Sequence, residues 1–404
     1  MLVTYLVCKA ENYINSVIII SLVKTDALLL SLSRSLRSFV STLLSFSSPF
    51  FLLSEGIGYF QVGIVILLSS ISSAVLVYTL PVIRVGVSSK VFLSWAIFFT
   101  GTAVIALTDN LAGYLVAAIV CGISLSGKDM SPNQPIEQYA ISTLSSNQKE
   151  KYHQFSYYNL LSYAGNTFGA LSVLVYPRIS FASIFYICAI LSFASGIPYF
   201  LVKFPHQNMP AKNKIVLDRK DKMLRNQLGT LFAIDAFAGG LVSTSLLSLW
   251  FLVVFSASLT QTGFIFVVVN ILTALSVVIS GRMSVRYGII RTMVFTHLIS
   301  NFFLILMSFS RILLLGELFL FLRQATSQMD LTPRDSLINT VFESESRLKT
   351  NSQFLAIRNL SSVPSPALGG LIIGNSPEPL PSIAGSIKAV YDIVLYLRFR
   401  HIMI

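Results

Sequence analysis

Charge is what this sequence has least of. Only 11% of its 404 residues are Asp, Glu, Lys or Arg, whereas soluble domains carry about 25%. Apolar residues fill long blocks instead, such as 62–80 and 181–202. Each block has about the 20 residues that a helix needs to cross a bilayer core of about 30 Å. The composition excludes a soluble globular protein and predicts an all-α polytopic membrane protein.

Cysteine and histidine are also scarce. The three cysteines are isolated, and two of them, Cys121 and Cys188, fall inside apolar blocks, which argues against a disulfide framework. The four histidines share no metal-ligand spacing. No Gly-x-x-x-x-Gly-Lys-Ser/Thr loop is present to cradle phosphates, and no His-Glu-x-x-His motif suggests hydrolysis. We therefore expect no cofactor, no metal and no enzymatic activity.

Apolar blocks separated by turn residues predict twelve membrane-spanning helices. They lie near residues 28–52, 59–83, 91–108, 111–130, 153–175, 181–202, 229–255, 262–281, 289–309, 312–331, 350–374 and 381–397.

The longest strongly charged connection falls between the sixth and seventh predicted spans and divides the chain. We expect an N-terminal cytoplasmic extension (1–27), an N-terminal six-helix bundle (28–202), a basic cytoplasmic linker (203–226) and a C-terminal six-helix bundle (227–404).

The basic residues of the loops predict the orientation. Loops on one side of the predicted spans hold eighteen lysines and arginines, against only Arg178 and Arg311 on the other. Because loops rich in Lys and Arg stay in the cytoplasm, both termini are expected there, in a multi-pass protein of the cell membrane. The net charge of +12 then reflects topology and contact with anionic lipid, not a nucleic-acid partner.

Two halves of the sequence repeat each other. KDMSPN (128–133) and MDLTPR (329–334) share Asp-x-x-Pro at an offset of 201 residues. Residues 159–171 match 359–371 at an offset of 200, and 84–91 match 286–293 at an offset of 202. The matches rest on Asp, Pro, Asn, Arg and Gly, which chance pairing of apolar segments would not supply. They predict a duplication of six helices.

Twelve spans in two parallel six-helix repeats resemble the major facilitator superfamily. The resemblance covers about residues 28–400; GRMSVRYGIIR (281–291) is similar to the family's loop motif, and LRQATSQMDLTPRDSLINTVFESESR (322–347) to the tenth-helix region of prokaryotic permeases and drug-efflux-like members. The chain departs from the loop motif at Val285 and Ile83, where the family has an acid.

This resemblance implies two pseudo-symmetric bundles around a central cavity. It also implies a secondary transporter, a monomer that moves a small solute by alternating access with a proton or another ion as coupling partner. Two alternatives stay open: a non-transporting sensor or scaffold, and a membrane-embedded enzyme.

The tenth predicted span carries the clearest polar stripe. It consists of Arg323, Ser327, Asp330 and Arg334, whose spacing places them on one helix face. Arg323 lies about 16 Å from the outer end of the span, near the bilayer middle. We expect Arg323, Gln324, Ser327 and Gln328 to contact the solute. The alternative is a structural ion pair between Arg323 and Asp330 or another acid.

A second group of polar residues is expected to gate the cavity or anchor loops. It comprises Asp129, Asp330, Arg334, Arg84 and Arg286, which lie at the repeated Asp-x-x-Pro segments and loop motifs.

The first and seventh predicted spans hold Arg34, Arg37 and Asp235, which we expect to line the cavity. Arg34 and Asp235 are 201 residues apart and so are equivalent in the two repeats; a pair between them would close the cytoplasmic side. Asp235 is the expected proton carrier, because burial favours the uncharged carboxyl group. The alternative is that all three snorkel toward the interface. The arginines indicate an anionic or polar solute, whereas a cationic solute would be expected to bind at Asp235.

Three further residues stand inside predicted spans. Lys388 and Asp392 are four residues apart and are expected to neutralise each other. Arg358 is expected to reach an acid on another helix. His297 is open to two interpretations, a proton relay or a hydrogen-bonded packing residue.

Overall fold

A computed structural model describes residues 24–80, 83, 85–108, 110–123, 125–127, 131–145, 148–175, 180–204, 219–331, 333–334, 337–338, 353–354 and 356–400. The regular elements within these ranges are helices. In the first half of the chain they are α2 (Thr25–Ser54), α3 (Tyr59–Thr79), α4 (Val87–Leu107), α5 (Leu111–Val120), α6 (Asn133–Leu144), α7 (Gln148–Val175), α8 (Phe181–Ala194) and α9 (Ile197–Leu201). In the second half they are α10 (Arg219–Leu241), α11 (Thr244–Phe255), α12 (Leu259–Tyr287), α13 (Ile289–Met307), α14 (Leu313–Ser327), α17 (Ser365–Asn375) and α18 (Leu380–Phe399).

Fewer helices than predicted meet the length and hydropathy of a membrane span. Seven do so among the described residues, or eight when α10 and α11, bent by 40° at a short break, count as one. The expected number of twelve is therefore not confirmed. Four predicted spans do not qualify: 111–130, 312–331 and 350–374 hold only shorter helices among the described residues (α5, α14 and α17), and α7 is a continuous 28-residue helix that is not apolar enough.

The predicted fourth span shows how such a break arises. Its first part is α5, which ends at Val120. Gly122 then takes a left-handed backbone (φ +61°), which side chains other than glycine rarely adopt. The next helix among the described residues, α6, begins at Asn133 with Pro132 as N-cap. The second-half counterpart, α14, likewise ends at Ser327, shortly before the repeated Asp-x-x-Pro segment.

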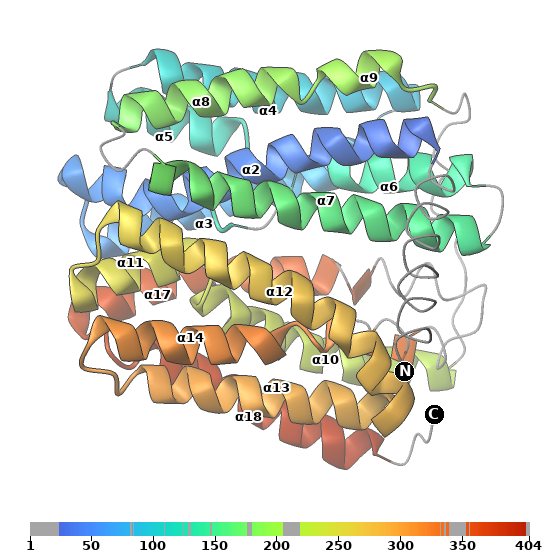
Figure 1. Ribbon diagram of the computed structural model, residues 1–404, viewed down its shortest axis with the longest axis vertical. Coiled ribbons are helices and arrows are strands. Elements are labelled where there is room, and N and C mark those ends of the chain that lie inside the picture. The colour runs from blue at the N-terminus through green and yellow to red at the C-terminus, as the bar shows by residue number, and fades with distance from the viewer. Residues whose placement is uncertain are drawn as a thin grey trace, which may run out of the picture.

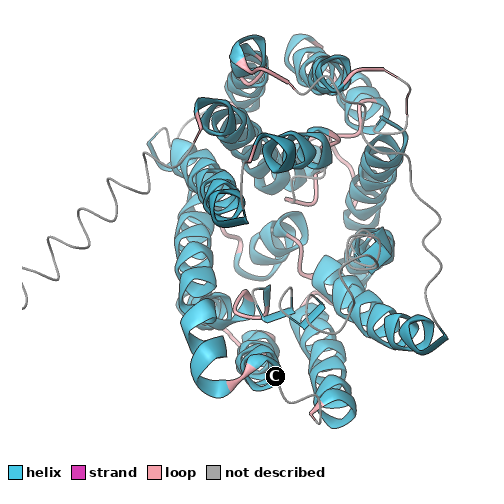
Figure 2. Ribbon diagram, turned by 90° about the vertical axis from the view of Figure 1, so that its right-hand side faces the viewer, coloured by secondary structure: helices cyan, strands magenta, loops and turns pink. Residues whose placement is uncertain are grey.

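The helices of the two sequence halves gather in separate regions of the molecule. Figure 1 shows α2 to α9 (blue to green) above α10 to α18 (yellow to red), and in Figure 2 most helices are seen nearly end-on. In the first half, α2 packs along α7, and α4 along α8; in the second, α18 packs against α13 and α10. The start of α2 and the end of α18 lie at the same end of the molecule (Figure 1).

The two halves meet at the opposite end, where α3 begins and α17 ends. A Cβ atom added to Gly63 would collide with the backbone oxygen of Pro366, and one added to Gly370 would lie 2.6 Å from the backbone oxygen of Tyr59. Small residues allow membrane helices to approach closely. Glycine on both helices therefore lets α3 and α17 come into backbone contact.

Further contacts between the halves lie beside that helix pair. The Ser248 hydroxyl donates to the backbone oxygen of Phe46 at 2.6 Å, and the rings of Phe46 and Phe266 stack with centroids 5.8 Å apart. Both phenylalanines belong to an apolar core that runs through both halves. This end of the molecule is therefore closed by packing and hydrogen bonds together.

Candidate functional site

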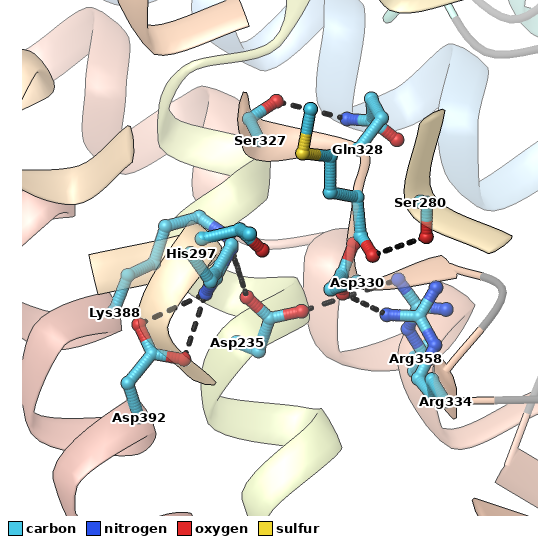
Figure 3. A network of polar contacts seen from close by, with 12 residues as sticks. Asp235, Ser280, His297, Ser327, Gln328, Asp330, Arg334, Arg358, Lys388 and Asp392 are labelled. Carbon is cyan, nitrogen blue, oxygen red and sulfur yellow. Dashed lines mark hydrogen bonds and ion pairs between the residues drawn. The ribbon is translucent and has the colours of Figure 1, made fainter. Parts of the chain in front are cut away.

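The second half contains a cluster of buried charges around Asp235, a single acid in the apolar stretch FAIDAFAGG of α10. Its Oδ1 lies 2.5 Å from Nζ of Lys388 on α18 and 3.8 Å from Nε2 of His297 on α13. Its Oδ2 lies 4.0 Å from Nη2 of Arg358, in the helical segment 356–362. Figure 3 shows these side chains converging from separate helices.

His297 connects this cluster to a second carboxylate. Its Nδ1 lies 2.8 and 3.0 Å from the two oxygens of Asp392. Asn301, one turn along α13, donates from Nδ2 to Asp392 Oδ2 at 2.7 Å. Asp392 is fully buried. The imidazole therefore lies between two carboxylates, one on α10 and one on α18.

The predicted neutralisation of Lys388 by Asp392 is wrong. Lys388 pairs with Asp235, and Asp392 bonds to His297 and Asn301. The spacing of four residues does place Lys388 and Asp392 on one face of α18, but that face packs against α10 and α13. Those helices bring closer partners to each side chain.

Asp330 and Arg334 form a buried pair of their own. Arg334 Nη1 donates to Asp330 Oδ2 at 2.8 Å, and both side chains are less than a tenth exposed. The preceding backbone is tied to α12, where the Ser280 hydroxyl donates to the carbonyl of Met329 at 2.6 Å. The alternative pairing of Arg323 with Asp330 is therefore not the arrangement observed.

Arg323 instead bonds to its neighbour. Its Nη1 donates to Oε1 of Gln324 at 2.7 Å, and Gln324 Nε2 donates to the Thr273 hydroxyl on α12 at 2.5 Å. The Nε atom of Arg323 is buried without a hydrogen-bond partner. Of the other predicted solute contacts, Ser327 is buried, and Gln328 donates to its hydroxyl at 3.3 Å.

In the first half, Arg37 is part of a fully buried ion pair. Its Nη2 lies 2.7 Å from Glu137 Oε2, and neither side chain is exposed. The hydroxyls of Tyr158 and Tyr199 donate to the same carboxylate at 2.5 and 2.6 Å. Arg37 was expected to face the cavity; in this conformation it has no accessible surface, because Glu137 and the two tyrosines enclose it.

Glu137 itself was not among the residues singled out from the sequence. It falls in a segment between predicted spans, where an acid is ordinarily solvated. The signal that it is buried is its spacing within α6, where Asn133, Ile136, Glu137, Ala140 and Ile141 are all buried and form one helix face.

Arg34 contacts α7. Its Nη1 donates to Asn159 Oδ1 at 3.0 Å, and its guanidinium lies 4.2 Å from the ring centroid of Tyr158. The expected pair with Asp235 is not formed, since the ionic partners of Asp235 all belong to the second half. Nor does the interfacial alternative fit, because Arg34, Arg37 and Asp235 are all buried.

Polar contacts continue along α2 and α7. Ser38 and Ser162 share a hydrogen bond of 2.8 Å, and Thr42 donates to Asn166 at 2.9 Å. Gly165 and Gly169 face backbone of α2 on the same side of α7. The two helices therefore pack closely along a row of polar side chains.

Equivalent positions of the two repeats carry different chemistry. Arg34 corresponds to Asp235 at an offset of 201, and Tyr158 to Arg358 at an offset of 200. In the first half the pair is a cation over an aromatic ring; in the second it is a carboxylate 4.0 Å from a guanidinium. These two equivalent positions therefore carry one charged side chain in the first repeat and two in the second.

The remaining predicted gating residues are less informative. Asp129 and Arg84 lie outside the described residues. Arg286, in the last turn of α12, is exposed and lies over the ring of Tyr287 at 5.3 Å.

The sequence and the fold were compared with those of known proteins. The family model "Major Facilitator Superfamily" matches residues 30–323. The human organic anion transporter MFSD10 (TETRAN) is similar in structure, with a TM-score of 0.66 at 13% identity over 92% of this chain and 99% of that one. A mutant of the nucleoside transporter NupG gives a TM-score of 0.66 at 13% identity over 93% and 98%. No curated protein matches the sequence. The helical fold and the matched family model agree with the sequence repeats, and the chain belongs to the major facilitator superfamily of membrane transporters.

Proposed function

We propose that this protein is a secondary active transporter that moves a small solute across the cell membrane by alternating access, coupled to protons. The observation that carries the proposal is the cluster of Asp235, His297, Lys388 and Asp392, which joins three helices inside an apolar bundle. Ionisable groups within a membrane are costly and occur mainly where transport or proton relay needs them.

The proposal keeps the twelve spans and the domain boundaries expected from the repeats. Interrupted helices then count as single crossings: α5 with α6, α10 with α11, α14 with the segment after it, and 353–362 with α17. Two bundles of six helices result, joined by the basic linker. The excess of loop lysines and arginines supports cytoplasmic termini.

Alternating access requires contacts between the halves that form at one end and break at the other. The glycine contact of α3 with α17 and the Ser248–Phe46 hydrogen bond supply such contacts at the end away from the start of α2. We propose that this is the outer end, closed here, and that the Asp330–Arg334 pair belongs to the opposing gate.

Proton coupling is proposed to run through Asp235 and His297. In this conformation Lys388 stabilises Asp235 as a carboxylate, since an adjacent cation favours the charged form. Asp235 takes up a proton only when Lys388 moves away. Because the two residues stand on α10 and α18, protonation is linked to a rearrangement of these helices.

The two similar structures do not select a solute, because one is named for organic anions and the other for nucleosides. The general proposal is tested by solute uptake into proteoliposomes, with and without a pH gradient. Accumulation that collapses when the gradient is abolished is the expected result. Folded protein that moves no solute under any gradient would overturn the carrier function and favour a transporter-like sensor or scaffold.

Under the same proposal, Asp235→Asn is expected to abolish pH-driven accumulation and to retain exchange of solute across the membrane. Proton dependence that survives in this variant would remove Asp235 from the coupling mechanism. Lys222→Gln, at an exposed position of α10, is the matched control.

A further inference from the structure

Two arginines inside the second half have no close acid. Among the described residues of this half, Arg334, Lys388, Asp235, Asp330 and Asp392 are buried, whereas Arg323 and Arg358 are partly exposed, as is the acid Glu317 of α14. Each buried acid already has a close partner: Lys388 for Asp235, Arg334 for Asp330, and His297 for Asp392. Arg323 and Arg358 are left without a carboxylate at hydrogen-bond distance.

One edge of the Arg323 guanidinium group has no hydrogen-bond partner within the described part of the chain. Only Nη1 is engaged within the protein, by Gln324. Nε is buried and makes no hydrogen bond, and Nη2 has no hydrogen-bond partner within the part of the chain that the structure describes. Nε and Nη2 together form the edge that binds a carboxylate or phosphate group through two parallel hydrogen bonds.

Arg358 also lacks an acid at hydrogen-bond distance. Its nearest acid oxygen is 4.0 Å away on Asp235, its Nε has no partner, and its side chain is 29% exposed although it lies beside buried residues. Asp235 is close enough to exert an electrostatic influence on both Arg358 and Arg323. The two arginines therefore belong to one electrostatic environment.

One tyrosine of the first half lies close to the charged residues of the second. Tyr163 of α7 lies within electrostatic range of Arg34 in the first half and of Asp330 in the second, so it stands between the halves. Its side chain is partly exposed.

We propose that Arg323 anchors the solute, a small organic anion whose carboxylate or phosphate group binds the open edge of the guanidinium, and that Arg358 contacts a second polar or anionic group of the same molecule. This inference rests on the proposed transporter function and names its substrate class. The anion supplies the close negative group that Arg323 and Arg358 do not have within the protein, which makes the loaded site less costly in the membrane than the empty one.

The test combines uptake with binding. Proteoliposomes are given an equimolar mixture of benzoate, phthalate, phenyl phosphate, benzamide and benzylammonium, and internal solutes are measured by mass spectrometry. The same probes are tested singly for thermal stabilisation of the protein in lipid nanodiscs. Preference for the anions over benzamide and benzylammonium is expected. Benzoate against phenyl phosphate separates carboxylate from phosphate recognition, and phthalate tests for a second anionic contact.

Arg323→Gln is expected to lower anion uptake at limiting concentration at least about tenfold, because it removes a charge-assisted hydrogen-bond pair. Arg323→Lys keeps the charge but not the two-point edge and should fall between. Arg358→Gln should affect phthalate more than benzoate. Arg311→Gln, at an exposed position before α14, is the matched control and should behave as the unmodified protein.

The outcomes separate this inference from the general function. Uptake of benzamide or benzylammonium in preference to the anions leaves a transporter but overturns the anion site. Anion stabilisation that is lost in Arg323→Gln, without uptake of any probe, supports the site and argues against transport. Absence of both anion uptake and anion stabilisation, or anion effects unchanged in Arg323→Gln, overturns the inference.

Discussion

The contact between Asp235 and Lys388 makes a quantitative prediction about stability. Both side chains are less than a tenth exposed and lie 2.5 Å apart. Removing one partner of a buried pair costs about 3–5 kcal/mol, whereas replacing both is often close to neutral. Asp235→Asn should be the more damaging single change, since it leaves Lys388, His297 and Arg358 around an uncharged side chain. Lys388→Met leaves Asp235 with His297 at 3.8 Å and Arg358 at 4.0 Å, so it should cost less.

The double variant Asp235→Asn/Lys388→Met decides whether this reasoning holds. Its free energy of unfolding, measured by denaturant titration in detergent micelles, should recover to within about 1–2 kcal/mol of the unmodified protein. Lys222→Met, at an exposed position of α10, provides the control for the loss of a lysine. Costs of the two single variants that simply add in the double variant would refute the description of these residues as a mutually compensating pair.

Three further outcomes are expected. His297→Gln should keep solute exchange but lose accumulation driven by a pH gradient, because its side chain does not titrate; uptake whose pH dependence is unchanged would exclude His297 as a relay. Gly370→Leu should separate α3 from α17, because even a Cβ atom there would lie 2.6 Å from a backbone oxygen, and spin-label distances between these helices should increase; Gly374→Leu, with only ordinary contact at 3.8 Å, is the control. Glu137→Gln should lower the free energy of unfolding by about 3–5 kcal/mol, because it removes the acid that pairs with the buried Arg37, and Arg37→Met/Glu137→Gln should restore most of it; a single variant as stable as the unmodified protein would contradict the role of this pair.

Membership of the superfamily and the all-helical fold could be predicted from the sequence, because long apolar blocks and polar residues repeated at nearly constant offsets are local signals. The interruptions were harder to predict. The segment 111–130 reads as one apolar block, and its break at Gly122 depends on a backbone conformation that composition does not specify. Helix boundaries therefore differ most where glycine and proline lie near polar residues.

Pairing partners were the least predictable feature. Lys388 and Asp392 lie four residues apart, and sequence spacing alone favours a bond between them; the actual partners come from α10 and α13, whose rotation about their axes cannot be read from one sequence. Glu137 was missed for the same reason, since its burial depends on how α6 turns toward α2. By contrast, Arg323 can be singled out from the sequence alone, because the equivalent position of the first repeat at an offset of 201 residues is Gly122; its contact with a solute stays a prediction.

In the proposed transport cycle, the arginines that lack a close acid also link the conformation of the protein to the electrical potential across the membrane. One elementary charge that moves through 100 mV changes in energy by about 2.3 kcal/mol, in proportion to the fraction of the field it crosses. A carrier in which Arg323 and Arg358, without a close acid, change position with the conformation would have a voltage-dependent balance between its conformations when empty. An inside-negative potential favours the conformation in which that charge lies nearer the cytoplasm. In that cycle a bound anion would offset part of this charge, so voltage would act more on the return of the empty protein than on the passage of its solute.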